Sequence, residues 1–145
     1  MVEPRALSET FAASTQLSEA DFAALAAAGY KTMINNRPDG EEPGQLTAAA
    51  ARQLAQEHGL NYVHIPVKMS ELTPEVVAQF KAALEENPEP ILAHCKSGTR
   101  SSLLWAIAMA KQTDASIDEL MQRTAQAGYD LTRFRPLIEQ LVKVG

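Results

Sequence analysis

The single cysteine of the chain, Cys95, opens a short loop of small and polar residues whose types and spacing suit nucleophilic chemistry. An apolar run precedes the loop and a longer apolar run follows it, which predicts a buried strand, a turn and a buried helix. The thiol would then lie near Arg100 and beside helix amides that have no intrahelical partners. In such surroundings a thiol ionises readily and becomes a nucleophile. The loop reads Cys95-Lys96-Ser97-Gly98-Thr99-Arg100-Ser101.

The same loop is expected to hold an anion, because the N-terminus of a helix is the positive end of the helix dipole. Gly98 lets the backbone fold so that successive amides point inward, and Ser101 is placed to donate a hydrogen bond to the sulfur. Arg100 would clamp the anion with its planar guanidinium. The predicted anion-binding residues are Lys96, Ser97, Gly98, Thr99, Arg100 and Ser101, with Arg37 as a further positive charge from another loop.

Several of these residues also have a plainer structural interpretation. A lone cysteine is often a small buried apolar side chain. Arg100 could form an ion pair with a neighbouring carboxylate, and Arg37 could bridge Asp39 or Glu41 within its own loop. For Cys95, the order His-Cys-x-x-Gly-x-Arg-Ser favours the nucleophile.

This order of residues resembles the signature loop of the cysteine-dependent phosphatases and of the rhodaneses, which share a thiolate, a cradle of backbone amides and an arginine. Together with NNRPDGE at 35–41, HIPV at 64–67 and AGYDL at 127–131, the loop is similar to that of the bacterial family labelled beta-lactamase hydrolase-like, phosphatase-like domain. Some members of this family are called sulfur transferases. The resemblance covers nearly the whole chain, and it implies a cysteine-phosphatase-like fold and an enzyme with a thiolate nucleophile.

The spacing between the cysteine and the arginine differs from that of the phosphatases. In the tyrosine and dual-specificity phosphatases five residues separate the two, whereas four separate Cys95 from Arg100, which is the rhodanese spacing. A shorter loop makes a tighter ring of amides. We expect such a ring to fit a sulfur substituent on the cysteine better than a full tetrahedral phosphate.

A phosphatase also needs a general acid to protonate the departing alkoxide. In phosphatases of this architecture an aspartate stands in the loop after the strand that matches residues 62–67. Here that loop has the sequence KMSE at 68–71 and contains no aspartate. Glu71 or Asp39 could take the role, although a carboxylate that faces water or caps a turn is at least as simple an interpretation of each.

Sulfur transfer needs no such acid. A Cys95 thiolate would attack the outer sulfur of thiosulfate or of a persulfide, carry that sulfur as a persulfide and pass it to a second thiol. We therefore predict a cysteine-dependent sulfur transferase that uses a small anionic sulfur donor and a thiol acceptor, with a sulfur-oxidising enzyme as a candidate partner. The alternatives are a phosphatase that hydrolyses phosphate esters through a phosphocysteine, and a noncatalytic sensor of anions or persulfides.

Length and composition are those of one globular domain, which we place at residues 1–145. Hydrophobic residues make up 46% of the chain, and the net charge of -5 argues against nucleic-acid binding. No apolar run is long enough to span a membrane, the start of the chain does not read as a signal peptide, and one cysteine cannot form an internal disulfide; we expect a reducing cytoplasm. Three separated histidines and one cysteine do not make a metal site, and no cofactor is expected.

Strands that alternate with helices predict an α/β fold with a mainly parallel central sheet of four to five strands and helices on both faces. Ligands of such sheets bind beyond the carboxyl ends of the strands, where the loops at 36–39, 67–71 and 94–95 should meet. Strands are expected at 10–14 (a short edge strand), 30–35, 61–67 and 91–94, and helices at 17–28, 47–58, 73–86, around 103–110, at 116–127 and, with an irregularity at Pro136, at 131–142.

Overall fold

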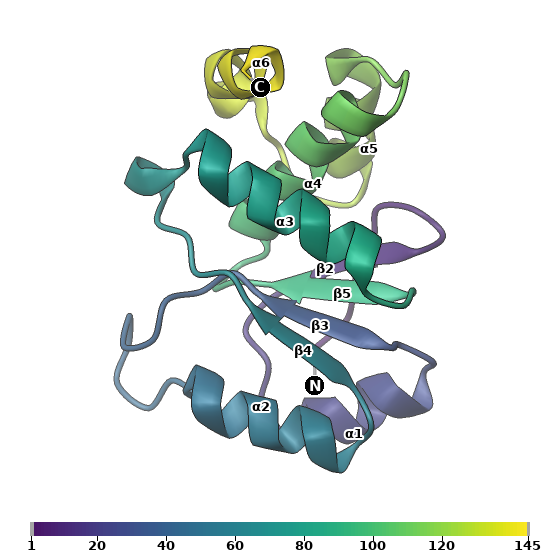
Figure 1. The fold of residues 1–145 in the computed structure, drawn as a ribbon, viewed down its shortest axis with the longest axis vertical. Helices are drawn as coiled ribbons and strands as arrows, with labels where there is room; N and C mark the ends of the chain where they lie inside the picture. Colours follow the sequence, from purple (N-terminus) through teal and green to yellow (C-terminus); the bar gives the residue numbers. More distant parts are fainter. Residues whose placement is uncertain (1, 145) are drawn as a thin grey trace.

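A five-stranded sheet forms the middle layer of the structure, a computed structural model that describes residues 2–144 (Figure 1). The strands lie in the order β1-β2-β5-β3-β4. All neighbouring pairs are parallel except β1 and β2, which are antiparallel. The strands span Arg5–Ala6 (β1), Phe11–Ser14 (β2), Thr32–Asn35 (β3), Asn61–His64 (β4) and Ile91–His94 (β5).

The four parallel strands end at one level. In the register of the sheet, His94 at the end of β5 lies opposite Ser14 of β2 and Asn35 of β3, and Asn35 lies opposite His64 of β4. The loops that follow these strands therefore leave from one edge of the sheet. This arrangement confirms the predicted α/β fold with a mainly parallel sheet.

The predicted edge strand is wrong in one respect, because β2 lies inside the sheet. The two-residue strand β1 folds back against it and forms the edge. All four residues of β2 are buried, as a strand with neighbours on both sides requires, whereas the two residues of β1 are exposed. A strand as short as β1 has too few residues to show an alternating pattern.

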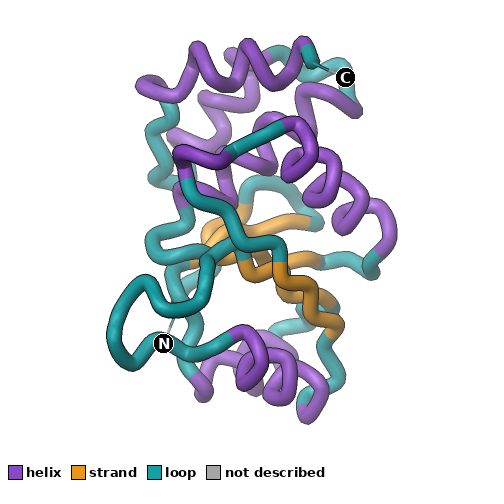
Figure 2. Tube along the Cα trace, turned by 60° about the vertical axis from the view of Figure 1, so that its left-hand side comes forward, coloured by secondary structure: helices purple, strands orange, loops and turns teal. Residues whose placement is uncertain are grey.

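Helices cover both faces of the sheet (Figures 1 and 2). α1 and α2 lie on one face and α3 to α6 lie on the other. The predicted last helix consists of a 3-10 turn and a separate helix that starts near Pro136, because a proline ring fits the first turn of a helix. The helices span Glu19–Ala27 (α1), Ala48–Glu57 (α2), Pro74–Glu86 (α3), Thr99–Gln112 (α4), Ile117–Gln126 (α5) and Arg135–Lys143 (α6), with 3-10 turns at Met69–Glu71 (η1) and Thr132–Phe134 (η2).

The helix that follows the cysteine loop is the most deeply buried one. Every residue of α4 from 101 to 108 is buried, and Trp105 stacks on Phe11 of β2 with ring centroids 6.0 Å apart. Phe11 also meets Phe80 of α3 edge to face. α4 is therefore fixed between the sheet and α3, α5 and α6, and its N-terminus is held rigidly at the carboxyl edge of the sheet.

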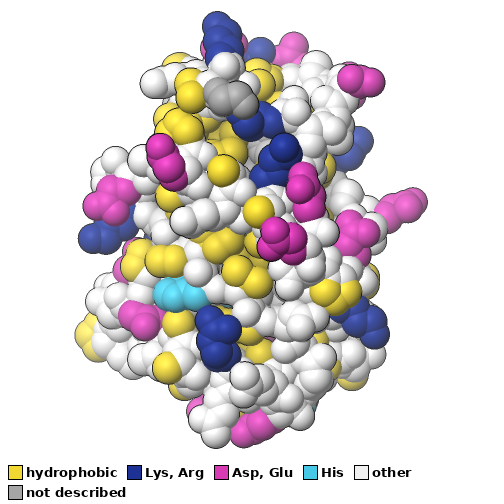
Figure 3. All heavy atoms as spheres, viewed as in Figure 1, with side chains coloured by type: hydrophobic (Ala, Val, Ile, Leu, Met, Phe, Trp, Pro, Cys, Tyr) yellow, Lys and Arg dark blue, Asp and Glu magenta, His cyan; other side chains and the backbone are white. Residues whose placement is uncertain are grey.

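The surface carries mixed charges. On the face viewed in Figure 1, acidic and basic side chains are interspersed and no broad basic patch is visible (Figure 3). Within residues 2–144 no helix is long and apolar enough to cross a bilayer, and no cluster of three metal-ligating side chains occurs.

Candidate active site

Cys95 lies at the N-terminus of α4, directly after β5. Its side chain is only 1% exposed, and the amide of Gly98 donates a hydrogen bond to Sγ over 3.1 Å. Gly98 precedes the helix with a φ of 103°, in the left-handed region that a residue with a side chain rarely adopts. This backbone turn directs the amide at the sulfur, so the structure brings the thiol and the start of the helix together.

Tyr129 closes over the same loop. A Cβ atom built on Gly98 would lie 2.3 Å from the Tyr129 hydroxyl, so the two residues are in close contact. Burial raises the pKa of Tyr129, and the charge of Cys95 adds to this effect. Arg5 stacks on the other side, 5.5 Å from the centre of the Tyr129 ring. From the sequence, Tyr129 could be expected to face the crevice because it follows the helix-terminating Gly128, but no chemical role was assigned to it.

Arg100, in the first turn of α4, holds a carboxylate with its guanidinium. Its Nη1 and Nη2 atoms donate to Oε2 and Oε1 of Glu41, each over 2.9 Å, and Nη1 also donates to the carbonyl of Val67 over 2.9 Å. The bond to Glu41 raises the pKa of Arg100, and the nearby Cys95 raises it further. The guanidinium therefore lies within the electrostatic reach of the thiol, and its terminal nitrogens already bind an anionic group.

Glu41 is the residue that sequence analysis missed as part of the site. It also accepts a hydrogen bond from Nε of Arg37 over 2.8 Å. The bond from Arg100 is the main cause that lowers the pKa of Glu41 to about 2, with Arg37 contributing after a smaller opposing effect of burial. This carboxylate is ionised at neutral pH and has no proton to give. Its pairings with Arg37 and Arg100 match the alternative interpretations of both arginines, an ion pair with a nearby carboxylate, although the sequence did not indicate which carboxylate Arg100 would meet.

Arg37 and Lys96 extend the positive charge away from the sulfur. The Arg37 side chain is 3% exposed, and its Nη1 donates to Gln16 Oε1 over 3.2 Å. Its Nη2 lies 3.2 Å from Glu42 Oε1 but is not aligned for a hydrogen bond. Lys96 Nζ lies 2.6 Å from the same Glu42 oxygen. Two carboxylates therefore face three cationic side chains at the mouth of the site.

The two predicted acids have other surroundings. Asp39 Oδ1 accepts a hydrogen bond from the amide of Ala48 over 2.9 Å and so helps to cap α2. Glu71 is exposed at the end of η1. No hydrogen bond within residues 2–144 joins either side chain to the cysteine loop. Both carboxylates thus match the plainer interpretation that the sequence allowed.

The expectation that Ser101 donates to the sulfur is wrong. Its hydroxyl donates to Oδ1 of Asn36 over 2.8 Å, in a buried position. The Asn36 side-chain Nδ2 in turn donates to the carbonyl of Ile65, and the Asn36 backbone N–H donates to the carbonyl of His94. A buried amide side chain needs partners for its oxygen and its nitrogen, and Ser101 supplies one of them. Ser101 thus joins α4 to the ends of β3 and β5.

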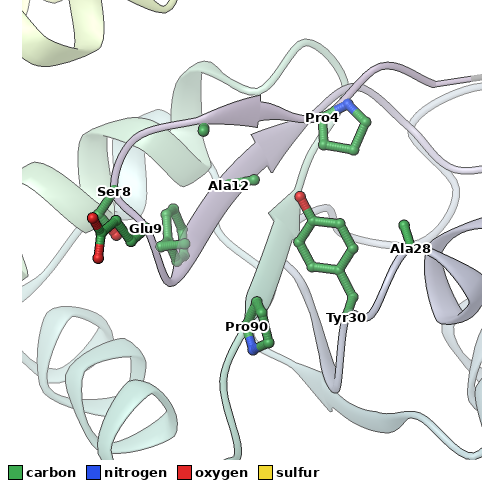
Figure 4. A pocket seen from close by; sticks show the side chains of 9 residues that line it. Pro4, Ser8, Glu9, Ala12, Ala28, Tyr30 and Pro90 are labelled. Carbon is green, nitrogen blue, oxygen red and sulfur yellow. The ribbon is translucent and has the colours of Figure 1, made fainter.

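A hollow lies at the opposite edge of the sheet. It has a volume of about 380 Å³ and is lined by residues around the start of the parallel strands, among them Tyr30 and Pro90. Figure 4 shows Tyr30 pointing into it toward the first two strands. Its lining contains no cationic side chain and no cysteine. This hollow therefore lacks the cations that an anion site needs.

Comparison with known proteins places the chain among phosphatase-like proteins. The family model described as beta-lactamase hydrolase-like protein, phosphatase-like domain, matches residues 3–112. A beta-lactamase hydrolase-like protein of Agrobacterium fabrum is 36% identical over 77% of this chain, and one of Xylella fastidiosa is 35% identical over 88%. These matches cover only 26% and 30% of the two relatives, so the chain spans less than a third of their length.

Solved structures agree with this assignment. A putative phosphatase from Neisseria meningitidis is 34% identical, covers 94% of this chain and 96% of its own, and superposes with a TM-score of 0.85. A putative phosphatase from Shewanella putrefaciens is 24% identical, covers 95% of this chain and 89% of its own, and gives a TM-score of 0.76. The fold is that of the cysteine phosphatases. The chain belongs to the family of beta-lactamase hydrolase-like proteins, phosphatase-like domain.

Proposed function

We propose that this chain is a phosphatase that hydrolyses phosphate monoesters through a phosphocysteine at Cys95. One observation supports the proposal most directly: Arg100, within electrostatic reach of the buried Cys95 thiol, binds the two oxygens of a carboxylate. A phosphoryl group presents a similar pair of oxygens to a guanidinium. The likeness to putative phosphatases over nearly the whole chain supports the same reaction.

Hydrolysis of the phosphate ester proceeds in two steps. The Cys95 thiolate attacks phosphorus, the bond from phosphorus to the ester oxygen breaks, and its electron pair leaves with the alcohol. Water then attacks the phosphocysteine, and the electron pair of the phosphorus–sulfur bond returns to the sulfur. In both steps Arg100 and the amide of Gly98 stabilise the negative charge at the N-terminus of α4. Glu41 has to release Arg100 when the substrate enters.

The surroundings of the carboxylates limit the choice of leaving group. Glu41 is ionised, Asp39 caps a helix and Glu71 is exposed. An alkoxide that leaves without a proton is a poor leaving group, whereas a phenolate is stable as an anion. We therefore expect aryl phosphates to react much faster than alkyl phosphates of the same charge.

Sulfur transfer is the second candidate. Two sequence features favour it: the four-residue spacing from Cys95 to Arg100, and the loop at 68–71 that contains no aspartate. The thiolate would attack the outer sulfur of thiosulfate, the sulfur–sulfur bond would break and sulfite would leave with its electron pair. The resulting persulfide would pass its outer sulfur to a thiol acceptor. A sulfur-oxidising enzyme remains a candidate partner for this reaction, in a reducing cytoplasm. A sensor would bind the same anions without turnover.

A single-turnover experiment distinguishes the three functions. The chain is mixed with 4-nitrophenyl phosphate or with thiosulfate, and the adduct on Cys95 is identified by intact mass. A phosphoryl adduct and release of phosphate, both lost in C95S and strongly reduced in R100K, support the phosphatase. One added sulfur atom that cyanide removes would establish the transferase in its place, and binding of phosphate or thiosulfate with no adduct would establish the sensor.

A further inference from the structure

Glu41 and Glu42 mark two neighbouring anion positions at the mouth of the site. Glu41 occupies the terminal nitrogens of Arg100, next to the sulfur. Glu42 Oε1 lies between Lys96 Nζ at 2.6 Å and Arg37 Nη2 at 3.2 Å. Two adjacent side chains of one loop thus place carboxylate oxygens on two separate sets of cations. A ligand with two linked anionic groups could replace both carboxylates.

The second position has a donor that is not satisfied. Arg37 is 3% exposed, and among residues 2–144 no acceptor is aligned for a hydrogen bond from its Nη2. A buried charged donor whose acceptor is poorly aligned is unfavourable, and a ligand that supplies a well-aligned acceptor relieves part of that cost. Glu42 cannot meet this need well, because its side chain is 48% exposed and its oxygen is shared with Lys96.

A groove continues from this second position along the surface. It has a volume of about 550 Å³, and Arg37, Lys96 and Glu42 stand among its lining residues. The rest of its lining comes from the segments at 16–19 and 43–46, which carry no further cation. The cations of the groove therefore lie where it meets the cysteine loop, and Glu19 is the one charged residue in the rest of its lining. This pattern suits an organic group that extends outward from a second anion.

We propose that the substrate of this site is an organic diphosphate, with its terminal phosphoryl group at Cys95 and Arg100 and its inner phosphate at Lys96 and Arg37. This inference rests on the proposed phosphatase function and specifies its substrate class. The inner phosphate takes the place of the Glu42 carboxylate and supplies the acceptor that Arg37 Nη2 lacks. The organic part extends into the groove.

A diphosphate also suits a site in which no carboxylic acid is placed to protonate the leaving group. The Cys95 thiolate attacks the terminal phosphorus, the bond to the bridging oxygen breaks, and its electron pair stays on the inner phosphate, which leaves as a monophosphate dianion. Lys96 and Arg37 stabilise the developing charge, so no proton is required. Water then attacks the phosphocysteine; both of its protons leave with the phosphate as dihydrogen phosphate, and the thiolate is restored.

Hydrolysis of two matched probes tests this inference. Methyl diphosphate and methyl phosphate carry the same organic group, and 4-nitrophenyl phosphate reports the basic phosphatase reaction. With a chelator present, we expect methyl diphosphate to yield methyl phosphate and phosphate with a kcat/KM at least 100-fold above that of methyl phosphate. If the aryl phosphate is hydrolysed but methyl diphosphate reacts no faster than methyl phosphate, the diphosphate assignment fails and the phosphatase stands. If the aryl phosphate is not hydrolysed, the phosphatase itself fails.

Two variants test the assigned position of the inner phosphate. We expect K96M to lower the ratio of kcat/KM for methyl diphosphate to that for 4-nitrophenyl phosphate at least 10-fold, and E42Q to raise this ratio. Lys31, which precedes β3 at the opposite edge of the sheet, provides the control K31M, and Glu57 at the end of α2 provides E57Q. A ratio that K96M and E42Q leave at the control value would overturn the proposed position.

Discussion

Glu41 binds Arg100 through both of its carboxylate oxygens, although the two residues are 59 positions apart in the sequence. The contact joins the loop after β3 to the first turn of α4, over the edge of the sheet where Cys95 lies. It has two consequences. The guanidinium is held in a fixed orientation, and the nitrogens that would bind a substrate oxyanion are occupied by the protein's own carboxylate.

Removal of the Glu41 charge should strengthen anion binding. In E41Q the amide oxygen can still accept a hydrogen bond from Arg100, but the competing negative charge is gone. Because the ion pair is partly exposed, with the Glu41 side chain 26% accessible, we expect phosphate to bind about 3-fold to 10-fold more tightly, on the order of 1 kcal/mol. Isothermal titration with phosphate measures this, with E57Q as the control. Weaker binding in E41Q would show that orientation of Arg100 matters more than competition.

The same pair should make stability depend on pH in acid. The pKa of Glu41 is lowered from 4.5 to about 2, chiefly by its bond to Arg100. The folded state therefore keeps this carboxylate ionised at pH values where the unfolded chain binds a proton. Its contribution to the free energy of unfolding is complete above about pH 4.5 and is lost as the pH falls through about 2. Urea unfolding between pH 5 and pH 2 should show a shallower decline for E41Q than for the wild type, and equal slopes would contradict the assigned pair.

The sequence was sufficient for the parts of the site that depend on local order along the chain. Apolar runs on either side of the loop predicted that Cys95 lies between a buried strand and a buried helix, and the parallel sheet predicted which loops meet there. Contacts between distant segments had no such signal. Glu41 looked like any loop carboxylate, and nothing local showed that Asn36 would turn the Ser101 hydroxyl away from the sulfur. Side-chain partners across a sheet edge depend on packing, which a pattern along the chain does not encode.

His94 should produce a second pH dependence at higher pH. It is 1% exposed, and burial lowers its pKa from 6.5 to about 4. The unfolded chain binds a proton to this histidine below about pH 6.5 while the folded chain does not, so stability is present above 6.5 and declines as the pH falls toward 4. This shift corresponds to a loss of about 2 to 3 kcal/mol across that range. H94Q should decline less steeply than the wild type, whereas H58Q, at an exposed histidine after α2, should keep the wild-type slope.

The contact between Gly98 and Tyr129 should make G98A more harmful than an ordinary glycine substitution. At Gly98 the backbone has a φ of 103°, and an added Cβ would meet the Tyr129 hydroxyl at 2.3 Å. Gly59 offers a matched control, because it has a φ of 72° and nothing lies within 4 Å of an added Cβ. The left-handed backbone alone costs a residue with a side chain about 1 to 2 kcal/mol. We expect G59A to lose that much stability and G98A to lose at least about 1 kcal/mol more, as overpacking does.

A double-mutant cycle separates the two causes at Gly98. In the Y129A background the contact is absent, so G98A should cost only the backbone term that G59A measures. Denaturant unfolding of the four proteins in the cycle gives the coupling between the two sites. A coupling near zero would mean that Tyr129 moves aside at no cost. Since Gly98 also directs its amide at Cys95 Sγ, G98A should lower the rate of Cys95 alkylation as well, and this loss should persist in the Y129A background because it comes from the backbone.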